Sequence, residues 1–185
     1  KKVGKQLVYY IATRSNPDIE GKEWEQIFAN AIGTDWKASN VGFEDIVMGN
    51  CAWSSKSIKS KKPTAEKTIR LISGRNDLGY SYDKFVTPEV EANEVGEKVL
   101  EIYNERVSLV RQKFKHARTI ILIRSYDLTE VVIYETETVR FEPEKYFWAW
   151  HGKNLWGFDK KTKKKKIFNG GYLGSRIEEE RSELR

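Results

Sequence analysis

Four consecutive large apolar residues, Ile-Ile-Leu-Ile at positions 120–123, form the strongest hydrophobic block in the chain. A block without alternating polar residues is typical of a central strand that is buried on both faces of a sheet. We therefore predict such a strand over residues 118–124. This segment constrains the fold most, because a strand of this kind requires neighbouring strands and a core on either side.

Two amphipathic helices are predicted upstream of this strand. In residues 20–33 apolar side chains recur at helical spacing, and Gly33 stands where a helix commonly ends. Residues 88–114 carry the longest helical stripe, and Pro88 suits its first turn. The stripe of the first helix comprises Trp24, Ile27, Phe28, Ala31 and Ile32. The stripe of the second comprises Val95, Val99, Ile102, Tyr103, Val107, Val110 and Phe114.

Several segments read as strands, with Gly49-Asn50 as a tight turn between the first two. The predicted strands cover residues 43–48, 51–58, 68–73 and 130–141. Residues 146–168 are predicted to form a short aromatic helix and a β-hairpin around residues 159–161. The predicted order is helix, three strands, helix, strand, then another strand with C-terminal additions.

The composition limits the class of protein. The 185 residues contain no linker-like segment and no repeat, which predicts one α/β domain with a core at about 20–141 and an extension at about 142–185. Six Trp, nine Tyr and eight Phe exclude wholesale disorder. One Cys and two His exclude a disulfide scaffold or a zinc site, so any metal must be held by oxygen. Neither a membrane span nor a signal peptide is evident, which predicts a soluble intracellular protein.

Three polar residues occupy the first predicted hairpin. Asp45 lies on its first strand, and Ser54 and Lys56 lie on its second. The two-residue period of a strand places Ser54 and Lys56 on one face, and the hairpin lets that face share a side with Asp45. A carboxylate and a lysine together suit chemistry at a phosphate.

The element order, Asp45 and the pattern Ser54-x-Lys56 resemble the PD-(D/E)XK nuclease superfamily, over about residues 20–170. The resemblance implies a restriction-endonuclease-like core of order α-β-β-β-α-β with a C-terminal β-hairpin extension. It implies a Mg²⁺-dependent endonuclease acting on double-stranded DNA, either a small type II restriction enzyme or the nuclease domain of a larger one. It further implies a homodimer in the cytoplasm of a bacterial or archaeal cell.

By this resemblance Asp45 is the central Mg²⁺ ligand, and Lys56 holds the attacking water or stabilises the phosphorane. Ser54 departs from the superfamily pattern, because serine cannot supply the second negative charge. A Ser-x-Lys version occurs in a subset of restriction endonucleases in which a glutamate has moved to a nearby element. Glu25, Glu23 and Glu66 are the candidates here, and Glu25 is favoured because a helix glutamate recurs at such sites.

Two segments carry candidate DNA-binding residues. Arg70 lies on the predicted strand over residues 68–73, and Arg75 and Asn76 follow it, where they suit a phosphate or a base edge. A lysine run lies between aromatic residues, an arrangement that suits a groove following a phosphate backbone. A solvated hairpin tip is the alternative for this run. Its residues are Lys160, Lys161, Lys163, Lys164, Lys165 and Lys166.

Other functions are weighed against hydrolysis of DNA. A non-catalytic DNA-binding module derived from a degenerate nuclease is the main alternative, and a protein-interaction domain with an incidental net charge of +6 is a weaker one. Glu135 and Glu137 share a strand face, but structural ion pairs explain them better than a carboxylate site. Cys51 reads as a buried small residue, and no nucleotide-binding loop appears.

Overall fold

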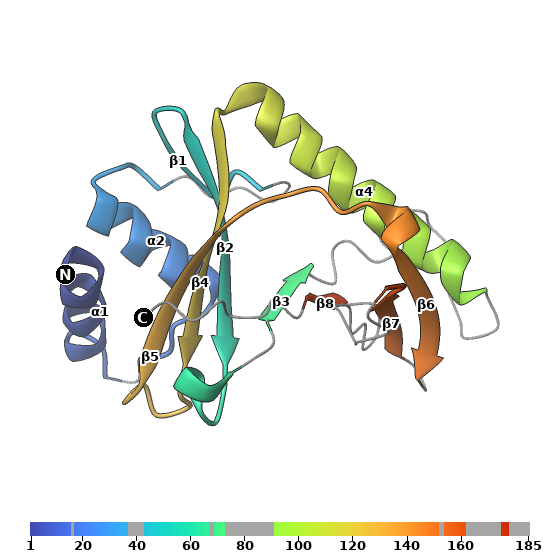
Figure 1. Ribbon diagram of the computed structural model, residues 1–185. Helices are drawn as coiled ribbons and strands as arrows, with labels where there is room; N and C mark the ends of the chain where they lie inside the picture. Colours follow the sequence, from blue (N-terminus) through green and yellow to red (C-terminus); the bar gives the residue numbers. More distant parts are fainter. Residues whose placement is uncertain are drawn as a thin grey trace. The chain divides into compact units, whose positions relative to one another are not determined.

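The computed structural model describes residues 1–15, 17–36, 43–66, 69–72, 91–151, 154–161 and 175–177 (Figure 1). The backbone divides into two compact units. The first unit combines Lys1–Ala65 with Arg106–Val139, and the second combines Glu66–Glu105 with Arg140–Arg185. The single domain that the sequence suggests, with its core and its extension, stays a prediction.

A four-stranded mixed sheet forms the centre of the first unit. β2 pairs antiparallel with β1 and parallel with β4, and β4 pairs antiparallel with β5. Gly49 makes the β1–β2 turn with a φ of 56°, a left-handed conformation that glycine adopts at little cost. In spatial order the strands are β1 (Ile46–Met48), β2 (Cys51–Lys59), β4 (His116–Arg124) and β5 (Val131–Glu137).

β4 is buried on both faces, which confirms the prediction from the apolar block. Ile120 and Leu122 belong to a core cluster on one face of the sheet. Ile121 and Ile123 point to the other face, because successive side chains of a strand alternate, and both are fully buried. The sheet therefore carries packed side chains on each side of β4.

Two helices, α1 (Lys2–Ala12) and α2 (Gly21–Ile32), lie next to each other on one side of this sheet (Figure 1). They pack into one core cluster with the strands. The cluster contains Leu7, Ile19, Trp24, Ile27, Phe28, Ala29, Ile46, Trp53, Ile120 and Leu122. α2 ends at Gly33 in the left-handed conformation, which confirms the predicted end of this helix.

α1 is not among the predicted helices, although its Leu7 is buried in the core. Val3 and Ile11 pack on the same side, but Val8 and Tyr9 are exposed on the other. Val3, Leu7, Tyr10 and Ile11 recur at helical spacing, so the sequence carries the amphipathic pattern of α1 and the prediction overlooked it.

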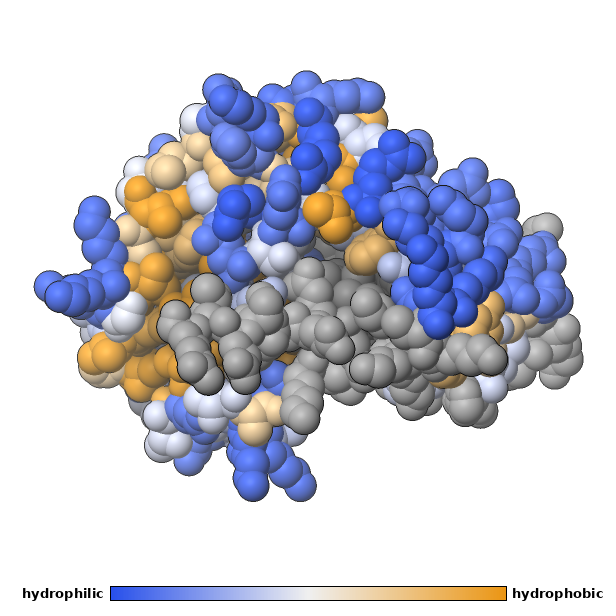
Figure 2. All heavy atoms as spheres, in the orientation of Figure 1, coloured by the Kyte–Doolittle hydropathy of each residue, from blue (hydrophilic) through white to orange (hydrophobic). Residues whose placement is uncertain are grey.

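The visible surface is mainly hydrophilic. In Figure 2 hydrophilic side chains cover the visible side of α4 (Ala92–Lys113), and apolar side chains gather toward the left of the view, where α1 and α2 lie. Among the helices in the described part of the chain, none combines the length and the apolar character that a bilayer crossing requires.

α4 confirms the second predicted helix over its described residues, and it runs from the second unit into the first. The predicted third strand of a β-meander is wrong in its pairing. β3 (Ile69–Ile72) pairs with β8 (Ser175–Ile177) in a separate two-stranded sheet. β3 cannot pair with β2, because each edge of a strand accepts one neighbouring strand and β1 and β4 already occupy both edges of β2.

The aromatic segment after residue 145 forms two strands, so the predicted short helix there is wrong. β6 (Tyr146–His151) pairs antiparallel with β7 (Asn154–Asp159). The connection of this hairpin lies between residues 151 and 154, whereas the predicted turn at 159–161 falls at the end of its second strand. Alternating aromatic residues favour a strand, since large flat side chains pack well on a pleated surface.

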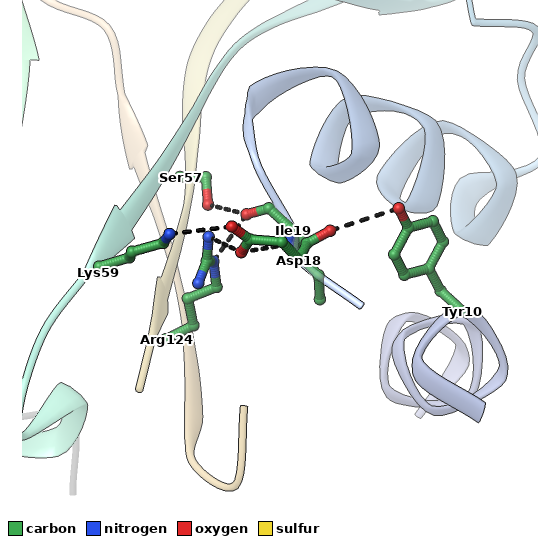
Figure 3. A network of polar contacts seen from close by, with 6 residues as sticks. All are labelled: Tyr10, Asp18, Ile19, Ser57, Lys59 and Arg124. Atoms are coloured by element: carbon green, nitrogen blue, oxygen red, sulfur yellow. Dashed lines mark hydrogen bonds and ion pairs between the residues drawn. The ribbon is translucent and has the colours of Figure 1, made fainter. Parts of the chain in front are cut away.

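A polar network joins the connection between α1 and α2 to the ends of β2 and β4 (Figure 3). Arg124 is 2% exposed, donates from Nε to the carbonyl oxygen of Ile19 at 2.7 Å, and forms an ion pair with Asp18. Ser57 donates to the same carbonyl oxygen at 2.7 Å, and Lys59 contacts Asp18 at 2.9 Å. These contacts hold the start of α2 against the sheet.

We predict that Asp18→Asn lowers the free energy of unfolding at pH 7 by about 1 to 3 kcal/mol, because it leaves the buried Arg124 without its ionic partner. The hydrogen bond from Lys59 and the charge of Arg124 hold the pKa of Asp18 below its ordinary value of 3.8. This stabilisation is present above pH 3.8 and is lost as the pH falls through the lower pKa of the folded state. Denaturant unfolding of both proteins between pH 7 and pH 2.5 measures the effect.

The exposed pair Lys98–Glu101 supplies the control, because Glu101→Gln removes a surface carboxylate with little effect. If the difference in the free energy of unfolding between wild type and Asp18→Asn stays constant down to pH 2.5, the prediction is contradicted.

We predict opposite effects for two helix glycines. A Cβ at Gly96 of α4 would lie 2.0 Å from the ring of Trp148, so Gly96→Ala forces the ring to move and destabilises the protein by about 1 to 3 kcal/mol. A Cβ at Gly4 of α1 meets nothing within 4 Å, so Gly4→Ala stabilises by up to about 1 kcal/mol. Thermal unfolding of the two variants measures these changes. A change of stability in the same direction in both variants would contradict the prediction.

Candidate active site

The β1–β2 hairpin brings Asp45, Ser54 and Lys56 together. The register pairs Ile46 with Trp53, and both belong to the core cluster, so Ser54 and Lys56 point to the opposite face of β2. Asp45 directly precedes β1. The backbone N–H of Ser55 donates to Asp45 Oδ2 at 2.7 Å, and the Ser54 hydroxyl contacts the same oxygen at 3.4 Å. Lys56 Nζ donates to Ser54 Oγ at 3.2 Å and to the carbonyl oxygen of Ser55 at 2.9 Å.

The direction of these hydrogen bonds follows from the groups. A lysine ammonium only donates and an ionised carboxylate only accepts. The Ser54 hydroxyl therefore accepts from Lys56 and directs its proton toward Asp45. Ser54 is 1% exposed, so this link between the cation and the carboxylate lies away from bulk water.

Glu25 on α2 interacts electrostatically with Asp45 and Lys56. Burial raises the pKa of Glu25 above its ordinary value of 4.5, and the negative charge of Asp45 raises it further. The hydrogen bond from Trp36 Nε1 to Glu25 Oε2, at 3.0 Å, lowers the same pKa, as does the charge of Lys56. One carboxylate from the hairpin and one from α2 thus act on each other across this site.

Each carboxylate keeps one oxygen for a ligand. The hydrogen bonds that the described residues make to Asp45 end on Oδ2, and the one to Glu25 ends on Oε2. Asp45 Oδ1 and Glu25 Oε1 are therefore the oxygens left to bind a cation. Two carboxylate oxygens and several waters are a common ligand set for Mg²⁺.

Trp36 is a site residue that the sequence analysis missed. It follows the end of α2, and Thr34 in the same segment donates to the carbonyl oxygen of Val47 in β1 at 2.8 Å. That contact brings the segment to the edge of the sheet near Asp45. No local spacing pattern signals it, because the partner of Trp36 lies eleven residues upstream on a helix.

The other two acids considered for the metal site are placed elsewhere. Glu23 and Glu25 are two residues apart on α2, so their side chains point in directions about 200° apart around the helix. Glu66 belongs to the second unit. The charge of Asp45 acts on Glu25, which keeps Glu25 as the favoured candidate.

The predicted DNA-binding residues are only partly described. Arg70 has its backbone in β3, and Lys160 and Lys161 are exposed directly after β7. Arg75, Asn76 and residues 163–166 lie outside the described residues. Their proposed contacts with DNA stay predictions.

Glu135 and Glu137 form structural ion pairs, as the sequence analysis favoured. Glu135 accepts from Arg118 at 2.5 Å and from Trp53 Nε1 at 2.8 Å, and Glu137 pairs with Arg111 at 2.8 Å. Cys51 is partly buried, and burial raises the pKa of its thiol, which disfavours the reactive thiolate.

Within the described part of the chain, no group of three or more His, Cys, Asp or Glu side chains is arranged to hold a metal ion. The pair of Asp45 and Glu25 is smaller than such a group. In comparisons with protein-family models, with curated proteins and with solved structures, nothing matched the chain. The function is therefore inferred from the geometry of the site.

We predict that two substitutions move the pKa of Glu25 in opposite directions. Trp36→Phe removes a hydrogen bond that favours the ionised carboxylate, so the pKa of Glu25 rises. Asp45→Asn removes a neighbouring negative charge, so the pKa falls. Carboxyl carbon chemical shifts followed through a pH titration measure both. An unchanged pKa of Glu25 in both variants would mean that Trp36 and Asp45 do not act on this carboxylate.

Proposed function

We propose that the protein is a Mg²⁺-dependent nuclease that hydrolyses phosphodiester bonds of double-stranded DNA. The observation that carries the proposal is the joining of Asp45 and Lys56 through Ser54. The charges of Asp45 and Lys56 both act on the partly buried carboxylate of Glu25. Asp45 and Glu25 would hold the metal, and Lys56 would act on the phosphate.

The donor set fits a hard divalent cation. Burial raises the pKa of Glu25, and repulsion from the negative charge of Asp45 raises it further. A cation between them relieves the repulsion, and carboxylate oxygens are ligands that Mg²⁺ prefers. When bound, Mg²⁺ supplies neutralisation of the negative charge that builds on the phosphoryl oxygens.

The chain's own residues supply orientation and charge. Hydrogen bonds from Ser55 N–H and Ser54 hold Asp45, and the bond from Trp36 holds Glu25. Lys56 keeps its ammonium group beside this pair through two acceptors, Ser54 Oγ and the Ser55 carbonyl oxygen. A fixed cation stabilises the negative charge of the transition state without a cost of reorganisation.

The order of elements supports the proposal of a restriction-endonuclease-like core. α2 precedes the β1–β2 hairpin, and α4 then leads into β4, which lies parallel to β2. This arrangement is similar to the PD-(D/E)XK core, with β3 as the departure. Cutting both strands of a duplex needs two sites, so we include in the proposal a type II restriction enzyme that acts as a cytoplasmic homodimer.

A non-catalytic DNA-binding module is the second candidate. Ser54 favours this candidate, because the PD-(D/E)XK pattern has an acid at this position. Without that acid, Asp45 and Glu25 are the two carboxylates proposed to hold the metal. Such a module binds DNA in a salt-dependent manner and leaves the strands intact.

We predict that the protein nicks or cuts supercoiled plasmid with Mg²⁺ and not with excess chelator. Asp45→Asn, Glu25→Gln and Lys56→Ala should each lower the cleavage rate at least about 100-fold, since each removes a charge that stabilises the transition state. DNA binding without Mg²⁺ should change little. Agarose gels and a filter-binding assay measure the two properties.

Glu101→Gln and Lys98→Ala are the matched controls, because they remove exposed charges of the same types on α4 and should cleave as wild type does. Binding without cleavage by the wild type would establish the second candidate instead. Full activity of Asp45→Asn would refute the proposed site.

A further inference from the structure

β5 forms one edge of the four-stranded sheet, and β1 forms the other. β5 pairs with β4 over seven consecutive residues without a bulge, whereas β1 pairs with β2 over three. Proline and lysine commonly protect an edge strand from pairing with another chain, and residues 131–137 contain neither. In the sheet that the described residues form, β5 is therefore the edge that is long and regular enough to accept a further strand.

The hydrogen bonds at the two ends of the β4–β5 ladder show which backbone groups of β5 are left over. Ser125 N–H donates to the carbonyl oxygen of Glu130, and Thr138 N–H donates to that of Ala117, both at 2.9 Å. Bonded and unbonded pairs alternate along an antiparallel ladder, so the even-numbered residues of β5 bond to β4. The odd-numbered residues direct their N–H and C=O groups to the outer edge, and they are Val131, Ile133, Glu135 and Glu137.

The apolar half of this outer edge is exposed. Val131 is 38% exposed and Ile133 is 40% exposed. The short helix η1 (Pro63–Ala65) contacts the strand at its start, where Thr64 N–H donates to Glu130 Oε1 at 3.2 Å. Within the described part of the chain, no backbone hydrogen bond outside the β4 ladder reaches the N–H and C=O groups of the odd-numbered residues. These groups are open to another strand.

The acidic half of the edge carries charges that are already paired. Glu135 forms an ion pair with Arg118, and Glu137 forms one with Arg111, so an arginine of the same chain offsets each carboxylate. Unpaired charges along an edge strand protect it by repelling a second strand, and here that repulsion is reduced. The edge therefore combines an apolar half with a neutralised acidic half.

We propose that a second copy of this chain pairs with the outer edge of β5, antiparallel and about a two-fold axis at Tyr134. A two-fold axis uses the same surface on both copies, so the strand has to complement itself. In this register Ile133 lies opposite Glu135 of the second copy, and Val131 lies opposite Glu137. Odd-numbered residues then face odd-numbered residues, as their outward backbone groups require, and the facing pairs make about eight hydrogen bonds.

The charges favour this arrangement over other pairings of two β5 strands. The apolar half of each strand lies against the acidic half of the other, which keeps the glutamates of the two copies apart. A parallel arrangement, or an antiparallel one about Glu135, would set like charges directly opposite each other, and such pairs are destabilising. The proposed pairing also joins two four-stranded sheets into one and removes both exposed edges.

The inference deepens the proposed function and rests on it in one respect, the need for two active sites to cut both strands of a duplex. It adds the surface that joins the two copies. β5 belongs to the same unit as Asp45 and Lys56, so pairing along β5 brings two units that carry these residues into one assembly.

The test measures the dissociation constant of the dimer by sedimentation velocity over a concentration series, without DNA and without Mg²⁺. We expect the wild type to dimerise and Ile133→Pro to raise the dissociation constant at least about tenfold, because proline removes an outward N–H from each copy and leaves the bonds to β4 in place. Ile133→Glu should weaken the dimer similarly, because it sets a carboxylate opposite Glu135 of the second copy.

Val8→Glu is the matched control, because Val8 is an exposed apolar residue of α1, 68% exposed, and this variant should dimerise as wild type does. Circular dichroism and thermal unfolding verify the fold of each variant. Ile133→Glu keeps the test informative if Ile133→Pro unfolds.

Oxidative cross-linking tests the register in a Cys51→Ser background, which removes the natural thiol. Tyr134→Cys should cross-link to its own copy, because the axis places the two positions opposite each other at a spacing that a disulfide spans. Glu137→Cys is the control on the same strand. Its two copies would lie about 20 Å apart along the strands and should not cross-link.

A monomeric wild type, or full dimerisation of both folded Ile133 variants, overturns the inference. Cross-linking of Glu137→Cys without cross-linking of Tyr134→Cys overturns the two-fold axis at Tyr134. Plasmid cleavage separates this inference from the proposed function. Asp45→Asn should dimerise without cleaving, and Ile133→Pro should nick plasmid but form less linear product. A wild-type dimer that does not cleave refutes the proposed function alone, and a monomer that cleaves refutes this inference alone.

Discussion

The pairing of β2 with both β1 and β4 is the constraint on which the first unit depends. β2 matches β4 at nine consecutive positions and β1 at three, so its register is set on both edges. A shift of one residue would move Trp53 out of the core and Ser54 into it. The same pairing that buries the apolar side chains therefore places Ser54 and Lys56 on one face of β2 and sets Asp45 beside Ser54.

The second carboxylate of the site depends on a different set of contacts. Glu25 belongs to α2, whose start is held to the sheet by Arg124 and Ser57 through the carbonyl oxygen of Ile19. The far end is fixed by Thr34, which bonds to β1. Because both ends of the helix are tied to strands that also carry the hairpin residues, Glu25 keeps its position relative to Asp45.

Local signals in the sequence predict the elements well and their partners poorly. The period of Trp24, Ile27 and Phe28 predicts α2, and the apolar block at 120–123 predicts β4, since burial of one or both faces leaves a direct pattern. The pairing of β3 with β8 leaves none, because residues more than a hundred positions apart meet only in the folded chain. For the site, the two-residue period on β2 predicts the common face of Ser54 and Lys56, whereas Trp36 acts through a tertiary contact that no spacing signals.

Serine at position 54 changes the electrostatics of the cluster. An acid there would place three carboxylates around Lys56, and their repulsion would raise the free energy of the folded state without a metal. With serine, Asp45 and Glu25 carry two negative charges against one positive charge, and the Ser54 hydroxyl joins the lysine to a carboxylate instead of adding a third charge. The second negative charge then comes from α2. Its place at the site depends on the packing of that helix on the sheet, so the integrity of the core and the capacity to hold a cation are linked.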